Sequence, residues 1–334
     1  MLPPAPPSFI RRIVPLRPSP LPPPPEAAAR LGARHTSGGQ LHAILCVVGA
    51  TLLFGIASVF VKLVSPPIPV MEVVFFRCIF SLLPLLPTMW RRHVRVFPVA
   101  SPGWHLARTV FGLVGMASSF YGVARLPLGD YTALCFVMPL VLTLLSVPFL
   151  GEKLGIRRVS AALVGFSGVL LIARPFGGED ALPLLPTLVV LGSTVTWSLS
   201  MVAIRRLGAL GEQNLVIIFW FAIGASLVSF AAMLPVWVTP DPWQLGLLIG
   251  VGVVSAYAQI MVTEGYRAGE TSVVAPFEYA AILWALLFGW LIWGERPEPS
   301  MLAGVAILIA SGLYILHREV VRRRERERLA AGPH

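Results

Sequence analysis

The chain has 334 residues and a formal net charge of +10; 56% of its residues are hydrophobic and only 13% are charged. Ordinary soluble domains carry about 25% charged residues, so the composition excludes a soluble protein and predicts a membrane protein. Nucleic-acid binding is not indicated, because the arginines lie in the tails and in short segments between apolar runs, where they act as topology signals.

Residues 1–40 differ in kind from the rest of the chain. They contain eleven prolines, five arginines and a single acidic residue, Glu26. A Pro/Arg-rich segment of this kind cannot bury a core, and we expect a disordered cytoplasmic tail. It has no apolar run typical of a signal peptide; a transit peptide and an overlong N-terminus are both open interpretations. The fold is predicted to begin near Leu41.

Ten apolar segments follow in chain order. A helix that crosses a bilayer needs about 20 mostly apolar residues. The predicted spans are 41–64, 69–90, 104–124, 129–149, 156–173, 184–206, 213–234, 243–266, 271–293 and 300–317. The connections are short and often contain Pro or Gly, so none can hold a soluble domain. The predicted fold class is therefore an all-α polytopic membrane protein with ten transmembrane helices.

The distribution of lysine and arginine predicts the orientation. With the N-terminus inside, twenty of the 26 basic residues lie on the inner side and four on the outer side, while Arg77 and Arg108 lie within spans. The positive-inside rule then places both termini in the cytoplasm, which requires an even number of spans. Only Lys62 and Lys153 are lysines. This bias is typical of a GC-rich bacterial genome, and the expected location is the inner membrane.

The second half of the chain repeats the first. Three pairs of segments match at an offset of 143 or 144 residues: 49–54 with 192–197, 151–153 with 294–296, and 167–170 with 311–314. Chance similarity between apolar helices is the alternative explanation. Because five spans are an odd number, the second copy is expected to insert upside down. The expected units are two inverted five-helix repeats at 41–175 and 184–318, followed by a basic cytoplasmic tail at 319–334.

Several segments carry a resemblance to a known family. They are Phe-Phe-Arg at 75–77, the stretches 108–112 and 120–129, the helix ends Gly-Glu-Lys at 151–153 and Gly-Glu-Arg at 294–296, and residues 274–279. The chain resembles the drug/metabolite transporter superfamily of the EamA-domain type over about residues 41–318. The resemblance implies a secondary active transporter of a small organic metabolite, such as an amino acid, S-adenosylmethionine or riboflavin. It is similar to bacterial uptake members for the last two solutes, with import and export both open.

Two charges lie deep within predicted spans. An ionisable group at the centre of a transmembrane helix costs at least ~2.5 kcal/mol, so each requires an explanation. Arg77 lies too deep in its span to reach the headgroups; it either holds an anionic group of a substrate or pairs with a carbonyl or carboxylate of another helix. Glu278 either binds a cationic group, transfers a proton as the coupling residue, or neutralises Arg77.

Proline and aromatic residues complete the predicted site. Pro139 and Pro276 each remove a backbone hydrogen bond, and such helix breaks in transporters line a cavity or are packing kinks. Aromatic side chains within the spans line a site or fill space between helices. The predicted substrate-binding residues are Arg77, Trp197, Tyr257, Glu278, Tyr279 and Trp284.

The remaining polar residues are assigned to structure. Arg108 lies near the inner end of its span and is expected to reach the headgroups there. Glu152 and Glu295 follow helix ends and are expected to cap the following helix or close a loop. Glycine pairs such as Gly165 and Gly168 are expected to serve close helix packing.

The sequence offers no signal of catalysis. It contains no Walker loop, dinucleotide fingerprint or Ser/His/Asp arrangement, so ATP-driven pumping and enzymatic activity are not supported. We expect no catalytic residue, no metal site and no cofactor; the three cysteines are interpreted as small hydrophobic residues. The expected partners are the lipid bilayer, a small-molecule substrate and a proton or exchanged solute, and a homodimer is one open assembly state. A non-transporting membrane partner or sensor protein is the alternative function.

Overall fold

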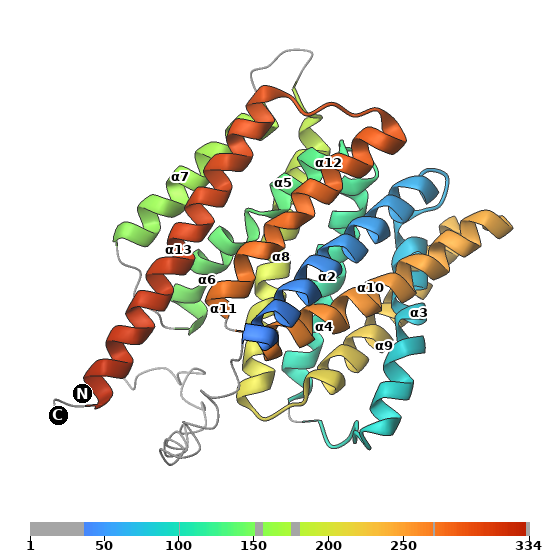
Figure 1. Cartoon of the computed structure of the whole chain (residues 1–334). Coiled ribbons are helices and arrows are strands. Elements are labelled where there is room, and N and C mark those ends of the chain that lie inside the picture. The colour runs from blue at the N-terminus through green and yellow to red at the C-terminus, as the bar shows by residue number, and fades with distance from the viewer. Residues whose placement is uncertain (1–36, 100, 151–155, 175–180, 270, 332–334) are drawn as a thin grey trace, which may run out of the picture.

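The computed structural model describes residues 37–99, 101–150, 156–174, 181–269 and 271–331. In this part of the chain every regular element is a helix (Figure 1). The helices are α2 (Ser37–Val64), α3 (Val70–Arg91), α4 (Pro102–Val123), α5 (Leu128–Cys135), α6 (Met138–Leu150), α7 (Ile156–Ala173), α8 (Leu184–Ala209), α9 (Asn214–Met233), η2 (Leu234–Val236), α10 (Pro242–Ala268), α11 (Thr271–Val274), η3 (Ala275–Tyr279), α12 (Ala280–Trp293) and α13 (Pro299–Ala331).

Eight of the described helices are long and apolar enough to cross a bilayer. The first of them, Gly39–Val64, reaches a mean hydropathy of 2.6. The expected spans 129–149 and 156–173 correspond to α5 with α6 and to α7, where the apolar helical stretches Leu128–Leu142 and Leu163–Ala173 are shorter. The chain is thus a multi-pass membrane protein, while the number of ten spans stays a prediction.

Local signals in the sequence explain where several helices begin and end. Asp241 caps α10, because its side chain accepts a hydrogen bond from Gln244 N while the Gln244 side chain accepts one from Asp241 N. Pro242 occupies the first position of that helix, where its missing N–H is no loss. Gly294 ends α12 in the left-handed conformation with φ of 67°, which glycine adopts without strain.

The helix boundaries repeat along the chain. A shift of 143 residues carries α2 onto α8, α3 onto α9 and α4 onto α10. The same shift carries α5 and α6 onto the segment from α11 to α12, and α7 onto the first part of α13. The offset found in the sequence therefore also relates the helices that the structure describes.

The packing of helices follows the same correspondence. The most extensive contacts are α2 with α10 and α4 with α8, and exchanging each helix for its counterpart converts one pair into the other. The contacts of α3 with α10 and of α4 with α9 are related in the same way. Counterparts also pack on each other: α3 lies against α9, and α7 lies against α13 (Figure 1).

Close helix approach depends on glycine where α7 crosses α13. A Cβ atom on Gly168 would lie 2.7 Å from the carbonyl oxygen of Gly304, and one on Gly304 would lie 2.5 Å from that of Gly168. These neighbours are backbone atoms, which cannot move aside for a side chain. Without a hydrophobic driving force between helices in lipid, this close backbone packing is a main source of association.

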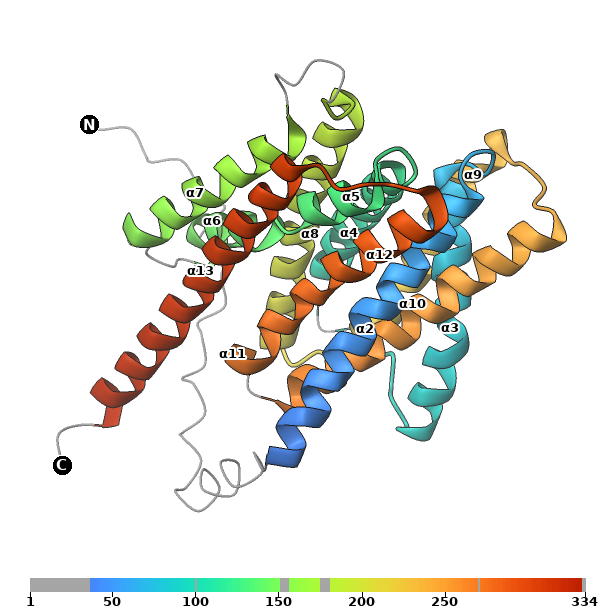
Figure 2. The same cartoon turned by 45° about the horizontal axis from the view of Figure 1, so that its top comes forward.

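The two ends of the described chain lie at the same end of the bundle. Figures 1 and 2 both place the first turn of α2 near the end where α13 finishes. An even number of membrane crossings requires this arrangement.

Candidate functional site

Two of the helices predicted to carry functional residues are interrupted within the bundle. Helix α5 ends at Cys135 and α6 begins at Met138, directly before Pro139. In the other half, α11 gives way to the 3-10 helix η3 at Ala275, directly before Pro276, and α12 begins only at Ala280. Both prolines therefore lie where the α-helix is broken, and their role in lining a cavity stays a prediction.

The two breaks are in contact with each other. Phe136 of the first break stacks on Tyr279 of the second, with ring centroids 4.7 Å apart and an angle of 31° between the planes. The Tyr279 hydroxyl lies against Gly312 of α13. Tyr279 therefore packs between the two broken segments and α13.

Glu278 is held by a tyrosine. The hydroxyl of Tyr266, on α10, donates a hydrogen bond of 2.7 Å to Glu278 Oε1. In the described part of the chain no ion pair joins Glu278 to Arg77, so the structure does not contain the neutralising pair that was one of the predicted alternatives. Glu278 and Tyr266 form a separate acidic group that joins η3 to the last turns of α10.

A second group of polar residues surrounds Arg108. The structure contradicts the expectation that Arg108 reaches the inner headgroups, because the residue is only 8% exposed. Its Nη1 donates a hydrogen bond of 2.7 Å to Ser200 Oγ, on α8. The guanidinium group lies 3.9 Å from the centroid of the Phe221 ring and 5.9 Å from that of Trp197. Trp197 thus belongs to this group, which sequence reasoning had missed.

Arg77 belongs to the same region as Arg108. Cys78, the residue after Arg77 on α3, packs in one buried cluster with Phe221, and Trp197 packs against this cluster. Arg77 itself is half-buried. The predicted site residues therefore separate into a basic group with Arg77 and Trp197 and an acidic group with Glu278.

The remaining two predicted residues lie apart from both groups. Trp284 packs against Gly55 of α2, and its Nε1 is buried without a hydrogen-bond partner. Tyr257 is 53% exposed, whereas the buried residues of α10 gather on another face of that helix. Among the described residues, neither side chain forms a hydrogen bond or ring contact with Arg108 or Glu278.

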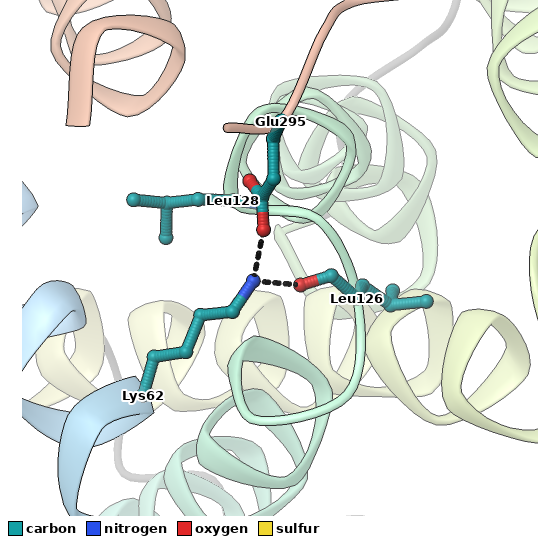
Figure 3. Close-up of polar contacts among 4 residues, drawn as sticks. All are labelled: Lys62, Leu126, Leu128 and Glu295. Carbon is teal, nitrogen blue, oxygen red and sulfur yellow. Dashed lines mark hydrogen bonds and ion pairs between the residues drawn. The ribbon is translucent and has the colours of Figure 1, made fainter. Parts of the chain in front are cut away.

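A polar link between the two halves was also missed. Lys62, at the end of α2, forms an ion pair of 2.5 Å with Glu295, which follows α12 (Figure 3). Lys62 also donates a hydrogen bond of 2.8 Å to the carbonyl oxygen of Leu126, and Glu295 accepts one of 2.7 Å from Leu128 N. Glu295 therefore caps α5 of the other half rather than the helix that follows it; Glu152 lies outside the described residues.

This link borders a small pocket. The pocket is lined by Pro127, Gly129, Asp130, Ala285, Leu286, Gly289, Glu295, Arg296, Pro297 and Met301. Asp130 in its wall lies 3.9 Å from Arg174 in a second ion pair. The cluster of charges at this end of the bundle joins α2, α5 and the segments after α7 and α12.

Comparison with known proteins identifies the family. The model of the EamA-like transporter family matches the chain twice, at residues 41–174 and 184–317. The pseudopaline exporter CntI of Pseudomonas aeruginosa is 30% identical over 269 residues, which cover 80% of this chain and 93% of the exporter. A riboflavin transporter of Vibrio cholerae is 27% identical over 283 residues, covering 84% of this chain and 90% of the relative.

Further comparisons agree. An S-adenosylmethionine uptake transporter of Rickettsia bellii is 27% identical over 248 residues, covering 74% of this chain and 84% of the relative. A solved crystal structure shares the fold with a TM-score of 0.59 at 21% identity, covering 85% of this chain and 98% of that one. The three named relatives are transporters rather than enzymes. The chain belongs to the EamA-like transporter family.

Proposed function

We propose that this protein is a secondary active transporter that moves a small organic metabolite across the bacterial inner membrane by alternating access. The observation that carries this proposal is the ion pair of Lys62 with Glu295, which joins the two repeats at one end of the bundle (Figure 3). In alternating access the two repeats rock against each other around a central site. A link between repeats at one end is then a contact that must break when that end opens.

The inverted arrangement of the repeats is part of the proposal. It is supported by the helix contacts that interchange when each helix is replaced by its counterpart. Charge distribution supports cytoplasmic termini, which places the Lys62–Glu295 pair on the periplasmic side.

The solute is proposed to be an amino-acid-like, S-adenosylmethionine-like or riboflavin-like metabolite. The named relatives support this range, because they include transporters of riboflavin and S-adenosylmethionine and an exporter of pseudopaline. They also include both uptake and export, so the direction of transport is part of what an experiment must determine. A homodimer remains compatible with the proposal, which does not depend on it.

Coupling to a proton or to an exchanged solute is proposed to involve Glu278. The carboxylate lies at a helix break, where the Tyr266 hydroxyl donates a hydrogen bond to one of its oxygens, Oε1. A carboxylate at membrane depth is a frequent element of proton relays. Substrate contact is assigned to Arg77, Trp197 and Tyr279, with Trp284 and Tyr257 as outlying members of the predicted set.

The experiment is a flux measurement with purified protein in proteoliposomes. Labelled S-adenosylmethionine, riboflavin and a mixture of amino acids are offered with a pH gradient of either sign, and uptake and efflux are both followed. We expect one class of solute to move faster than in protein-free liposomes. Failure of every class in both directions, with folded protein shown by its thermal unfolding, would contradict the proposal and favour a non-transporting membrane partner or sensor.

A further inference from the structure

The side chain of Arg108 carries its charge to the middle of α4, a helix long and apolar enough to cross a membrane. A Cβ atom added to Gly112 would meet Arg108 Nη1, so the guanidinium group lies over Gly112 rather than at the start of the helix. Gly112 is ten residues after Pro102 in a helix of 22 residues. At about 1.5 Å per residue this is about 15 Å along α4, close to its midpoint.

The guanidinium group has unused hydrogen-bonding capacity there. Arginine has five N–H donors in a planar fork. The bond to Ser200 Oγ uses Nη1, and Nε is buried without a hydrogen-bond partner. The aromatic rings of Phe221 and Trp197 face the guanidinium group. These rings partly compensate its charge through cation–π contacts, but they accept no conventional hydrogen bond from it.

A second positive charge increases the need for an anion. Arg77 directly precedes Cys78, which packs in the same buried cluster as Phe221, the ring that lies against Arg108. In the part of the chain that the structure describes, neither arginine forms an ion pair with an acidic residue. Buried charges in proteins are normally paired, because leaving one uncompensated is strongly destabilising. The region therefore has the charge and the donors of an anion site.

We propose that Arg108, together with Arg77, binds an oxyanion group, a carboxylate or a phosphate, of the transported solute. The fork of a guanidinium matches the two oxygens of either group in a bidentate pair. Ser200 holds Arg108 in position through the hydrogen bond at Nη1, and the Trp197 ring lies 5.9 Å from the guanidinium group. The identification of the bound anion with the transported solute rests on the proposed function, whereas anion binding at Arg108 does not.

A purely structural role is the competing explanation. In that case Arg108 joins α4 to α8 through Ser200 and to α9 through Phe221, and no anion is involved. The two explanations differ in one property: only a binding site makes the stability of the protein depend on an added anion. The test therefore measures ligand-dependent stability and does not require transport.

The experiment compares three probes that share one ring. Benzoate and phenyl phosphate carry an oxyanion, and benzamide has the shape of benzoate without its charge. Thermal unfolding of the purified full chain in a neutral detergent is measured with increasing concentrations of each probe. Because only the folded state binds, an anion that occupies the site raises Tm, and the rise grows with the logarithm of the anion concentration above Kd. We expect a rise with at least one oxyanion and none with benzamide; the more effective oxyanion distinguishes carboxylate from phosphate.

Variants connect the effect to Arg108. Arg108→Gln removes the charge and is expected to weaken apparent oxyanion affinity about 10-fold or more, as loss of a charged hydrogen bond does. Arg77→Gln is expected to weaken it as well. Arg125→Gln is the matched control, because Arg125 also stacks on an aromatic ring, 3.8 Å from the centroid of Tyr121, but is exposed. This control is expected to retain the affinity of the unaltered chain.

Two results would overturn the proposal. One is that neither oxyanion raises Tm of the unaltered chain more than benzamide does. The other is that Arg77→Gln and Arg108→Gln both respond to the oxyanions as the Arg125→Gln control does. If Arg108→Gln does not fold, Arg77→Gln and Ser200→Ala supply the comparison. A rise in Tm that depends on the oxyanion and on Arg108, without flux in proteoliposomes, would support this site and count against transport. Flux of neutral solutes without an oxyanion effect would support transport and count against this site.

Discussion

Phe136 and Tyr279 stack on each other across the two helix breaks, and they occupy the same position in the two repeats. Their ring centroids lie 4.7 Å apart, and their numbers differ by the repeat offset of 143 residues. Equivalent positions of two related units meet only close to the axis that relates the units. The pair therefore lies close to that axis, where the broken helices of both halves meet.

This contact predicts a measurable coupling between the two repeats. Phe136→Ala and Tyr279→Ala each remove the ring pair, and both are expected to lower Tm. A double-mutant cycle is expected to give a coupling of about 0.5–1.5 kcal/mol, as aromatic pairs do. Tyr279→Phe retains the ring and is the control, with a Tm close to that of the unaltered chain. Strictly additive effects of the two alanine substitutions would show that the rings do not interact.

The crossing of α7 and α13 predicts a position that tolerates no side chain. Gly168→Ala places a Cβ against the carbonyl oxygen of Gly304, and overpacking of this kind costs about 1–3 kcal/mol. Gly192→Ala is the matched control, because a Cβ there meets nothing within 4 Å, and helix propensity favours alanine by about 0.5–1 kcal/mol. Thermal unfolding should therefore show a lower Tm for the first variant only. Equal effects of the two substitutions would contradict the close approach of the helices.

The role of Glu295 predicts an order of stabilities. Glu295→Gln loses the charge that pairs with Lys62 but keeps an oxygen for the hydrogen bond from Leu128 N. Glu295→Ala loses both, so Tm is expected to fall from the unaltered chain to the glutamine variant and further to the alanine variant. A charged hydrogen bond contributes about 1.5–3 kcal/mol. The exchange of Lys62→Glu with Glu295→Lys should recover part of the loss seen when either is made alone, and no recovery would argue against direct pairing.

The proposed coupling residue predicts a change in driving force. Glu278→Gln cannot release or accept a proton, so flux in proteoliposomes should persist as exchange but lose its dependence on the pH gradient. Tyr266→Phe removes the hydrogen bond to Glu278 Oε1 while leaving the carboxylate, and it should alter the pH dependence without abolishing it. Full retention of proton dependence in Glu278→Gln would exclude this residue as the coupling group.

The architecture could be predicted because hydropathy and internal repetition are both contained in the order of the residues along the chain. The run from residue 41 to 64 and the offset of 143 residues needed no side-chain geometry. The broken helices at Pro139 and Pro276 follow from the missing N–H of proline in the same way. The two shorter apolar helices, Leu128–Leu142 and Leu163–Ala173, are not long enough to be identified as membrane spans by length and hydropathy alone.

The candidate site was predicted less completely, for two physical reasons. Arg108 lies near the end of its span, but its long side chain extends by about one helical turn towards Gly112, a direction that sequence position does not give. The partner of Lys62 lies 233 residues away, and only the tertiary fold brings the two together. Glu295 lies in the repeated segment 294–296, so the sequence singled out this residue without giving its partner.

The most direct test of alternating access uses the Lys62–Glu295 link. Cysteines replace both residues in a chain whose native Cys46, Cys78 and Cys135 are replaced by alanine, and a reducible bifunctional reagent joins them. Solute flux is measured in proteoliposomes before joining, after joining and after reduction, with each single-cysteine variant as control. The account predicts that joining abolishes flux and that reduction restores it. Undiminished flux in the joined protein would contradict the account, because this end of the bundle would then never need to open.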